Sequence, residues 1–445
     1  MTYALIRFSV VVDESSRLGE ASTVPEDLPM RHAGSLGGTI GQVRSVKART
    51  APRHGGSATR STAAILSVVV LVALNLRLAL SSLPVVATTI QEETGWSDAF
   101  IGILTTIPVL GMGVFALGVP RLAERIGRRA AVSAALATMA IALTLRAFGA
   151  VALTMLISAV LAGVAIAVIG GLVPGIVREQ LAGSMGTATA LWTAALMGGA
   201  ALGAAATFPI AEILGGWNLA LAFWALPAVA GLIAWITLER GSPAHDRPAV
   251  SVRLRDLPWR SPVAWSLTGL MALNSIIFYS LLAWIAPSYE ERGYSAETAG
   301  LFFAIFTGSQ ILAALTLPRV SHRTAYRRTV FTVTIVVCVV TLTLIALAPN
   351  VAPPVVLVVL AFNLSGGFAM ALGLLSEYAV DAAASARLTA MTFSITYIVA
   401  ACGPFIAGAL MDAVDSWALV FGLLAVVALA QLATVPRLTR GIRVD

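Results

Sequence analysis

The chain has 445 residues, of which 58% are hydrophobic and 11% are charged, whereas soluble domains have about 25% charged residues. This composition leaves too little polar surface to solvate a globule, so we assign the chain to a lipid bilayer. The formal net charge is +7, but the positive charge lies in short connections between apolar segments, where a topology bias explains it and nucleic acid is not expected as a partner.

The first segment, residues 1–62, differs from everything after it. It contains eight of the 29 Lys and Arg residues, with scattered Gly, Ser and Pro and no sustained hydrophobic periodicity. Such a composition is typical of a disordered segment, so we predict a disordered basic cytoplasmic tail. A translation start at Met30 is an equally good interpretation.

From Ala63 onward, apolar runs of about 20 residues alternate with short polar breaks, which is the length that crosses about 30 Å of hydrocarbon. These runs predict an all-α membrane protein. We predict two bundles of six helices, at 63–238 and 262–436, a cytoplasmic linker at 239–261 and a tail at 437–445. In chain order, the predicted spans are 63–82, 99–119, 130–148, 151–177, 185–209, 217–238, 262–286, 298–317, 328–347, 352–376, 386–410 and 415–435.

The basic residues predict the orientation, because cytoplasmic segments are enriched in Lys and Arg. If both termini are cytoplasmic, 26 of the 29 basic residues lie inside. Only Arg292 falls in an outer loop, while Arg77 and Arg146 fall within spans. We expect Arg146, at the outer end of the third span, to reach the membrane surface by snorkelling. The predicted location is the cytoplasmic membrane, crossed many times.

The two halves repeat one another. At an offset of 198, GWSDAFIG (95–102) aligns with GYSAETAG (293–300), and PRLAERIGRR (120–129) aligns with PRVSHRTAYR (318–327). Near the end of each half the offset becomes 200, which pairs Gly203 with Gly403 and Trp217 with Trp417. Parallel repeats of six spans imply a pseudo-two-fold axis along the membrane normal, with a site between the halves.

Several stretches resemble a known family. PRLAERIGRR resembles the loop signature of the major facilitator superfamily, G-x-L-A-D-R-x-G-R-R, with Glu124 in place of the Asp. LNLRLALSS, GILTTIPVLGMGVFA and GPFIAGALMD resemble the cyanate and 2-nitroimidazole transporter branch, although Gly170 and Asn274 replace an Asn and a Gln of that branch. The resemblance covers about residues 63–436. It implies two bundles that rock about a central cavity.

Arg77 is the main candidate for a substrate-binding residue. A cation deep in hydrocarbon costs several kcal/mol, about 3 on insertion scales. On an α-helix Arg77 and Asn75 point about 160° apart, so both cannot line one cavity. Either Arg77 binds an anionic or strongly dipolar substrate, or it snorkels or ties helix-end carbonyls together. With the polar and aromatic groups of other spans, the candidate substrate-binding residues are Arg77, Asn75, Trp192, Asn274, Tyr279, Gln310 and Tyr397.

The resemblance also implies a cytoplasmic gate made by charged residues of the loop signature. Glu124 and Arg125 are its centre, and the second half carries His322 where the first carries Glu124. The alternative is that these charges only signal topology. The candidate gating residues are Arg121, Glu124, Arg125, Arg128, Arg129, Arg319 and Arg323.

The absence of certain residue types argues against several classes of function. No acidic residue lies at mid-membrane, which disfavours coupling through a buried carboxylate. The His residues lie in polar connections, and we find neither paired carboxylates nor a nucleophile motif. We therefore expect no enzyme, metal or cofactor, but a monomeric transporter of a small polar or anionic, cyanate- or nitroimidazole-like solute working by alternating access. The alternatives are an exporter of amphiphilic drugs and a transport-dead sensor.

Overall fold

The computed structural model describes residues 62–180, 185–239, 254–323, 327–438 and 444. The predicted basic tail therefore lies almost entirely outside the described residues, as does much of the predicted linker and of the C-terminal tail. Within the described part, all regular structure is helical apart from one isolated β-bridge between Ala379 and Val444. The all-α prediction is confirmed.

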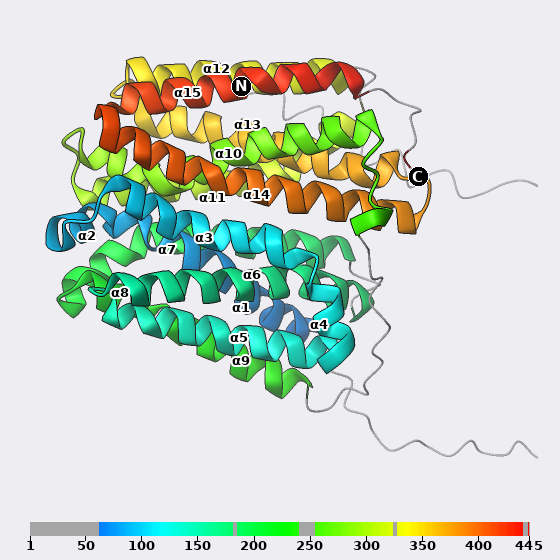
Figure 1. Ribbon diagram of the computed structural model, residues 1–445, viewed down its shortest axis with the longest axis horizontal. Helices are drawn as coiled ribbons and strands as arrows, with labels where there is room; N and C mark the ends of the chain where they lie inside the picture. Colours follow the sequence, from blue (N-terminus) through cyan, green and yellow to red (C-terminus); the bar gives the residue numbers. More distant parts are fainter. Residues whose placement is uncertain (1–61, 181–184, 240–253, 324–326, 439–443, 445) are drawn as a thin grey trace, which may run out of the picture. The chain divides into compact units, whose positions relative to one another are not determined.

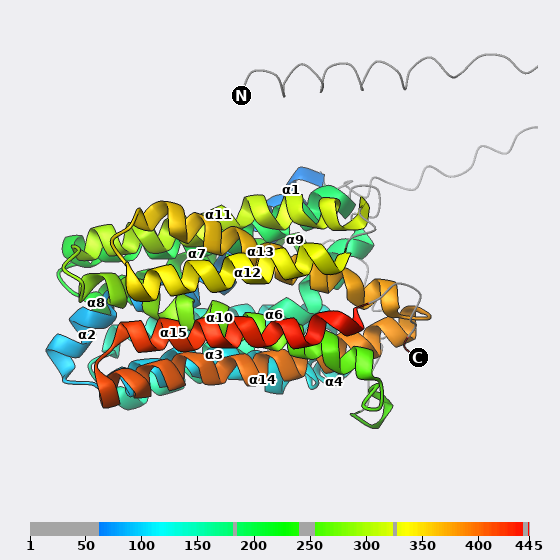
Figure 2. The ribbon, with the colours of Figure 1, turned by 90° about the horizontal axis from the view of Figure 1, so that it is seen from above.

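The first half of the described chain folds into helices that run along a common direction (Figures 1 and 2). Short helices flank the long ones because Pro84 and Gly127 interrupt the apolar runs at helix ends. These elements are α1 (Thr62–Ser81), η1 (Pro84–Val86), α2 (Ala87–Thr94), α3 (Asp98–Ala116), α4 (Val119–Ile126), α5 (Arg128–Leu145), η2 (Arg146–Phe148), α6 (Ala152–Gln180), α7 (Met185–Leu214), α8 (Trp217–Phe223) and α9 (Ala225–Glu239).

The second half repeats this arrangement with longer unbroken helices. A short 3-10 turn, η4 (Leu254–Asp256), leads into it, and Ser261 caps its first helix by accepting a hydrogen bond from Ala264 N. The remaining elements are α10 (Pro262–Glu290), α11 (Ala296–Arg323), α12 (Arg327–Leu347), α13 (Pro353–Tyr378), α14 (Ala382–Val414), α15 (Trp417–Ala430) and η5 (Gln431–Arg437).

Twelve helical spans in the described residues are long and apolar enough to cross a membrane, as predicted. One detail differs from the sequence prediction. The first span continues through η1 and α2 to Thr94, well past the predicted end at residue 82. Pro84 begins a new helical segment there, and the N–H group that proline lacks is not needed at the start of a helix. The residues of the loop signature, which lie between two predicted spans, mostly form helix α4.

The repeat seen in the sequence is also a repeat of contacts. Gly102 on α3 lies against the carbonyl of Pro404 on α14, and Gly300 on α11 lies against the carbonyl of Ala204 on α7. A Cβ at these glycines would lie 2.7 Å and 3.0 Å from the two carbonyl oxygens. Only a hydrogen side chain permits such close backbone approach. The two seams between the halves, α3 with α14 and α7 with α11, are therefore built alike.

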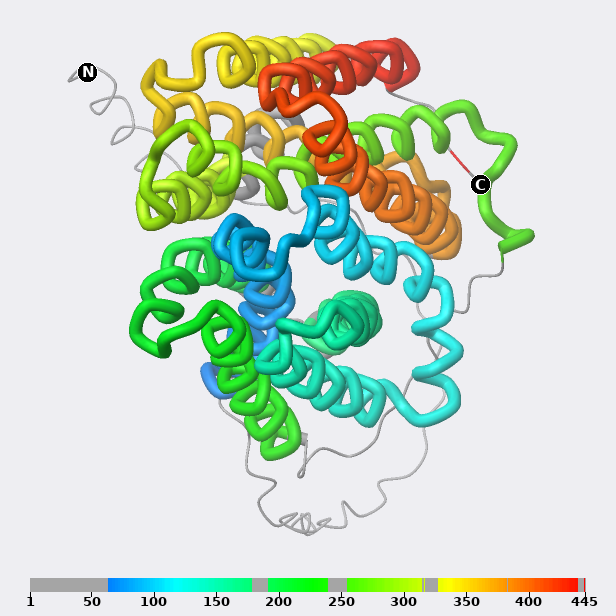
Figure 3. The backbone as a smooth tube through the Cα atoms, turned by 60° about the vertical axis from the view of Figure 1, so that its left-hand side comes forward, coloured from blue at the N-terminus to red at the C-terminus, as the bar shows by residue number. Residues whose placement is uncertain are grey.

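Within each half, a tryptophan closes one end of the bundle in the same way. Trp217 Nε1 donates to Glu93 Oε2, and Trp417 Nε1 donates to Glu291 Oε2, both at 2.7 Å. These bonds lie at the end of the helices marked by the connection at Gly95, called here the Gly95 end. The opposite end, marked by the turn at Gly127, is called the Gly127 end. Figure 3, in which the Gly95 end comes forward, shows the six spans of each half grouped together.

The halves also meet at the Gly95 end, where η1 and α2 contact α10. The most extensive seam is α3 against α14, and it continues along α3 as far as Gly113, which lies against Ser394 and Ile398. A Cβ at Gly113 would come within 2.8 Å of Ile398 N. The structure therefore holds the two halves tightly together from the Gly95 end along most of the length of α3.

Candidate functional site

Arg77 lies on the face of α1 that meets the second half. Its Nη1 donates a long hydrogen bond to Tyr279 Oη on α10, 3.5 Å away. Its Cζ atom lies 5.3 Å from the ring centre of Phe278 and 5.8 Å from that of Tyr279. A guanidinium within about 6 Å of an aromatic ring is attracted by the ring quadrupole. The cation thus stands at the boundary between the halves.

No carboxylate in the described part of the chain neutralises this cation. Within the described residues no carboxylate forms an ion pair with Arg77, since the ion pairs there join Arg255 to Asp256 and Arg327 to Glu377. The side chain of Arg77 is only half-buried. A guanidinium has five N–H donors, so most of those on Arg77 are available to something other than Tyr279.

An aromatic wall continues from this cation along the second half. Tyr279 packs edge-on against Tyr397 of α14, with ring centres 6.2 Å apart, and Tyr397 lies 5.7 Å from Phe393. On the other side, Phe278 stacks with Phe306 of α11 at 6.4 Å. Tyr397 is half-buried, as Arg77 is. Two rings of α10 therefore contact one arginine of the first half, and rings of α11 and α14 pack behind them.

Such a group can bind a small planar anion. A guanidinium recognises carboxylate-like groups through two parallel N–H donors, and aromatic walls favour flat solutes that need few hydrogen bonds. Tyr279 Oη accepts from Arg77 and donates to Met112 Sδ at 3.9 Å. This second contact orients the hydroxyl so that its lone pair faces the guanidinium.

Asn75 lies on the opposite face of α1, away from this group. It is fully buried, and its Nδ2 donates to Leu71 O at 2.8 Å and to Pro227 O of α9 at 2.9 Å. The sequence left open which of Arg77 and Asn75 faces the boundary between the halves. The structure gives that place to Arg77, and hydrogen bonding between helices accounts for Asn75.

Other candidates from the sequence lie apart from Arg77. Asn274 donates to Leu364 O of α13 at 3.3 Å, inside the second half. Gln310 donates to Phe306 O one turn back at 3.4 Å and is 3% exposed. Trp192 on α7 is half-buried against the hydrophobic core. Of the seven candidate binding residues, the contacts bring together Arg77, Tyr279 and Tyr397.

The candidate gating residues lie at the Gly127 end. Arg121, Glu124 and Arg125 are exposed on α4 and have no ion pair within the described residues. Arg128 and Arg129 begin α5 and are half-buried. The side chains of Arg319 and Arg323 lie outside the described residues, so the predicted contacts across this end remain a prediction.

Arg146 does not snorkel, contrary to the sequence expectation. It is 3% exposed and donates to Ala79 O at 2.9 Å and to the hydroxyls of Ser82 and Ser158, both at 3.2 Å. These groups come from α1, from the residue that follows it, and from α6. Because α1 ends at Ser81, its free carbonyls offer acceptors nearer than water. A buried arginine thus ties three spans of the first half together.

Sequence reasoning missed Phe278, which contacts the arginine, and Met112, which accepts a hydrogen bond from Tyr279. Adjacent residues on a helix point about 100° apart, so Phe278 was not expected to share Arg77 with Tyr279. A signal for Met112 was present, because glycines flank it. Gly111 packs against α6 and Gly113 against α14, which leaves Met112 to face the space between those helices.

The sequence is similar to a known protein family and to individual transporters. The sequence profile described as the Major Facilitator Superfamily matches residues 65–401. The cyanate transport protein CynX of Escherichia coli K12 is 30% identical over 346 residues, which cover 78% of this chain and 89% of that protein. The 2-nitroimidazole transporter of the same organism is 27% identical over 352 residues, which cover 78% of this chain and 88% of that protein.

Solved structures show the same fold. A crystal structure of the nucleoside transporter NupG matches with a TM-score of 0.70 at 15% identity, covering 84% of this chain and 100% of that one. A bacterial homologue of the lysosomal transporter Spinster matches with a TM-score of 0.65 at 14% identity, covering 84% and 94%. The profile match spans most of the chain, so this protein belongs to the Major Facilitator Superfamily and is a membrane transporter of twelve helical spans in two related halves.

Proposed function

We propose that the chain moves a small, planar anionic or strongly dipolar solute across the cytoplasmic membrane by alternating access, with Arg77 as the binding cation. The observation that carries this proposal is the position of Arg77 between the halves, where it faces aromatic rings and no carboxylate of the described residues pairs with it. Cyanate and 2-nitroimidazole, named for two relatives, are small and flat and belong to this class.

The proposed site uses three kinds of contact. The guanidinium supplies parallel N–H donors, Tyr279 and Tyr397 supply the rim, and Phe278 supplies a flat apolar wall. A charge-assisted hydrogen bond contributes about 1.5–3 kcal/mol, which corresponds to roughly 10- to 100-fold in Kd. Arg77 therefore accounts for much of the affinity expected for a weakly bound transported solute.

The orientation that we propose places both termini in the cytoplasm, because 26 of the 29 basic residues then lie inside. In that orientation the Gly95 end faces outward, and its close contacts between α2, η1 and α10 keep the outer side shut. Opening to the outside would part these contacts and the two glycine seams. Closing the inner side would bring α4 and its charged residues toward the second half.

The test uses purified protein and proteoliposomes. A thermal-shift screen against small anions, nitroheterocycles and amphiphilic drugs identifies the ligand class, because a ligand of the folded state raises Tm. Arg77→Gln should abolish the shift and the uptake of that ligand. Arg292→Gln is the matched control, since Arg292 also lies 5.3 Å from two aromatic rings but at the Gly95 end of the second half.

The proposal fails if Arg77→Gln and Arg292→Gln both bind and transport the ligand as the wild type does. Arg77→Lys separates two forms of the idea. Loss of binding in this variant indicates bidentate recognition, and retention of binding indicates that the charge alone is needed. A thermal shift with drugs and none with small anions would indicate an amphiphile exporter instead.

A further inference from the structure

An asparagine occupies the equivalent position in each of the two repeats. VALNL (72–76) on α1 aligns with MALNS (271–275) on α10, which pairs Asn75 with Asn274. Both are buried, at 0% and 7% exposure. A buried amide must find hydrogen-bond partners or lose free energy. The two halves provide different acceptors for the amide nitrogen.

In the first half the partner is the backbone of the sixth span. Asn75 Nδ2 donates to Pro227 O on α9 at 2.9 Å. Gly231 lies one turn further along α9, and a Cβ there would come within 3.2 Å of the same Nδ2 atom. The absence of a side chain at Gly231 is therefore what allows α1 and α9 to approach closely enough for the direct bond.

In the second half a long side chain occupies the equivalent place. The offset of 200 that pairs Trp217 with Trp417 pairs Gly231 with Gln431. Gln431 is 3% exposed. Its main-chain carbonyl accepts a bond from Thr434 Oγ1 at 2.7 Å, but its side-chain amide makes no hydrogen bond within the described residues. Asn274 bonds to Leu364 O of α13 and not to the twelfth span.

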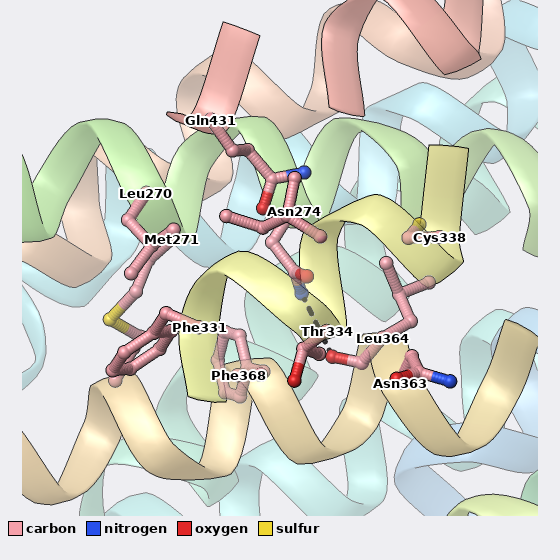
Figure 4. Close-up of a pocket in the computed structure, with 13 residues that line it drawn as sticks. Leu270, Met271, Asn274, Phe331, Thr334, Cys338, Asn363, Leu364, Phe368 and Gln431 are labelled. Atoms are coloured by element: carbon pink, nitrogen blue, oxygen red, sulfur yellow. Dashed lines mark hydrogen bonds between the residues drawn. The ribbon is translucent and has the colours of Figure 1, made fainter. Parts of the chain in front are cut away.

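The amide of Gln431 faces a cavity between α10, α12, α13 and η5, which Asn274 and Thr334 also line (Figure 4). The other walls are mostly apolar, from residues such as Met271, Phe331 and Leu364. The space open to the centre of a water molecule measures about 10 Å³. About 10–15 Å³ of such space holds one water, provided that two to four polar groups surround it.

We propose that this cavity binds a single water molecule, which bridges the side-chain amides of Asn274 and Gln431. Gln431 can donate to it and Asn274 Oδ1 can accept from it. Thr334 uses its proton on Val330 O, so its oxygen remains able to accept a second bond from the water. The joint between α10 and the twelfth span is thus hydrated, where the corresponding joint of the first half is a direct bond.

The proposal also assigns Asn274, a candidate substrate ligand from the sequence, to the inside of one bundle. Its function there is to hold a water between helices, and it takes no part in the site at Arg77. This inference stands or falls independently of the proposed transport function, because neither group of the pair contacts Arg77.

X-ray radiolytic hydroxyl labelling of the full-length protein in detergent tests it, because radicals formed from a bound water oxidise the side chains next to it. Met271 lines the cavity and Met139 lies in the core of the first half, and both are 0% exposed. Met271 should label several times faster than Met139. Gln431→Leu should bring the rate at Met271 down toward that of Met139, while Gln310→Leu should leave it unchanged.

Equal, slow labelling of Met271 and Met139 in the wild type would overturn the proposal, and this result needs no variant to fold. Fast labelling of Met271 that persists in Gln431→Leu would also overturn it, since the water would then not depend on the amide. A cryo-electron microscopy map that resolves ordered water gives a second readout, where density within hydrogen-bond distance of both amides is expected.

Discussion

The sharpest prediction concerns Asp412, which joins the two halves at the Gly95 end. Its Oδ1 accepts from Asp98 N and its Oδ2 accepts from Ala99 N, both at 2.9 Å. The carboxylate of α14 thus covers the first N–H groups of α3, in the other half. Because the N-terminus of a helix carries partial positive charge, Asp412→Ala should loosen this end.

The expected magnitude follows from the capping geometry. Removing a carboxylate cap costs about 0.5–2 kcal/mol, and Asp412 is exposed, so water screens its charge. We take about 1 kcal/mol, which changes the ratio of closed to open molecules about fivefold, because 1.4 kcal/mol is tenfold. Ser97 still caps Phe100 N at 3.3 Å. The loss therefore falls on the contact between halves and not on the folding of α3.

Glu212 provides the matched control, because it is the repeat equivalent of Asp412 at the offset of 200 and is exposed on α7. The closed-to-open ratio can be measured by electron–electron distance spectroscopy in lipid. Spin labels at positions 151 and 414 report the separation of the halves, since Val151 and Val414 are exposed at the Gly95 end, one in each half. Cys402→Ser removes the exposed native thiol.

We expect Asp412→Ala to increase the long-distance population about fivefold and Glu212→Ala to leave it unchanged. Asp412→Asn should give an intermediate value, since the amide keeps one acceptor oxygen and loses the charge. If Asp412→Ala and Glu212→Ala give the same distance distribution, the carboxylate does not hold the halves together and the reasoning from helix capping is wrong.

Three further predictions follow from the packing. Arg146→Ala should destabilise the protein by about 1–3 kcal/mol and so lower its thermal unfolding temperature in detergent, because buried hydroxyls and a carbonyl lose their donor; an unchanged unfolding temperature would contradict the assigned role of Arg146. Gly403→Ala should destabilise the protein because its Cβ would overlap α10, whereas Gly422→Ala, which has open space around it, should not; equal unfolding temperatures would count against the close packing of α14 on α10. Burial raises the pKa of the Glu291 carboxyl above its ordinary 4.5, although the hydrogen bond from Trp417 lowers it. The folded state therefore holds this proton more tightly than the unfolded state, so the free energy of unfolding should fall as the pH rises from the ordinary pKa through the raised one. Glu291→Gln should flatten this part of the profile of stability against pH.

Much of the fold could be predicted from the sequence, because the bilayer imposes a length on each apolar run. The twelve spans and the repeat are direct consequences of local composition. Helix interruptions were harder to predict. Pro84 marks a break in a helix, but whether the chain then turns back or continues to Thr94 depends on the contacts of α2 with the second half.

The candidate site was only partly predictable. Periodicity placed Arg77 and Asn75 on opposite faces of one helix, but it could not say which neighbour each face meets. The answer came from Pro227, whose carbonyl accepts from Asn75, and from Tyr279, whose hydroxyl accepts from Arg77. Partners 152 and 202 residues away in sequence leave no trace in a local pattern.

The sequence by itself determined that this chain spans a membrane as two related bundles and that one arginine lies deep within the first helix. Only the tertiary structure decided that this arginine faces the second half, that Arg146 is buried among helix ends, and that equivalent asparagines have different partners. The physical reason is that apolar length and repeat depend on residues near in sequence, whereas the partner of a buried polar group depends on which distant backbone or side chain the packed helices bring beside it.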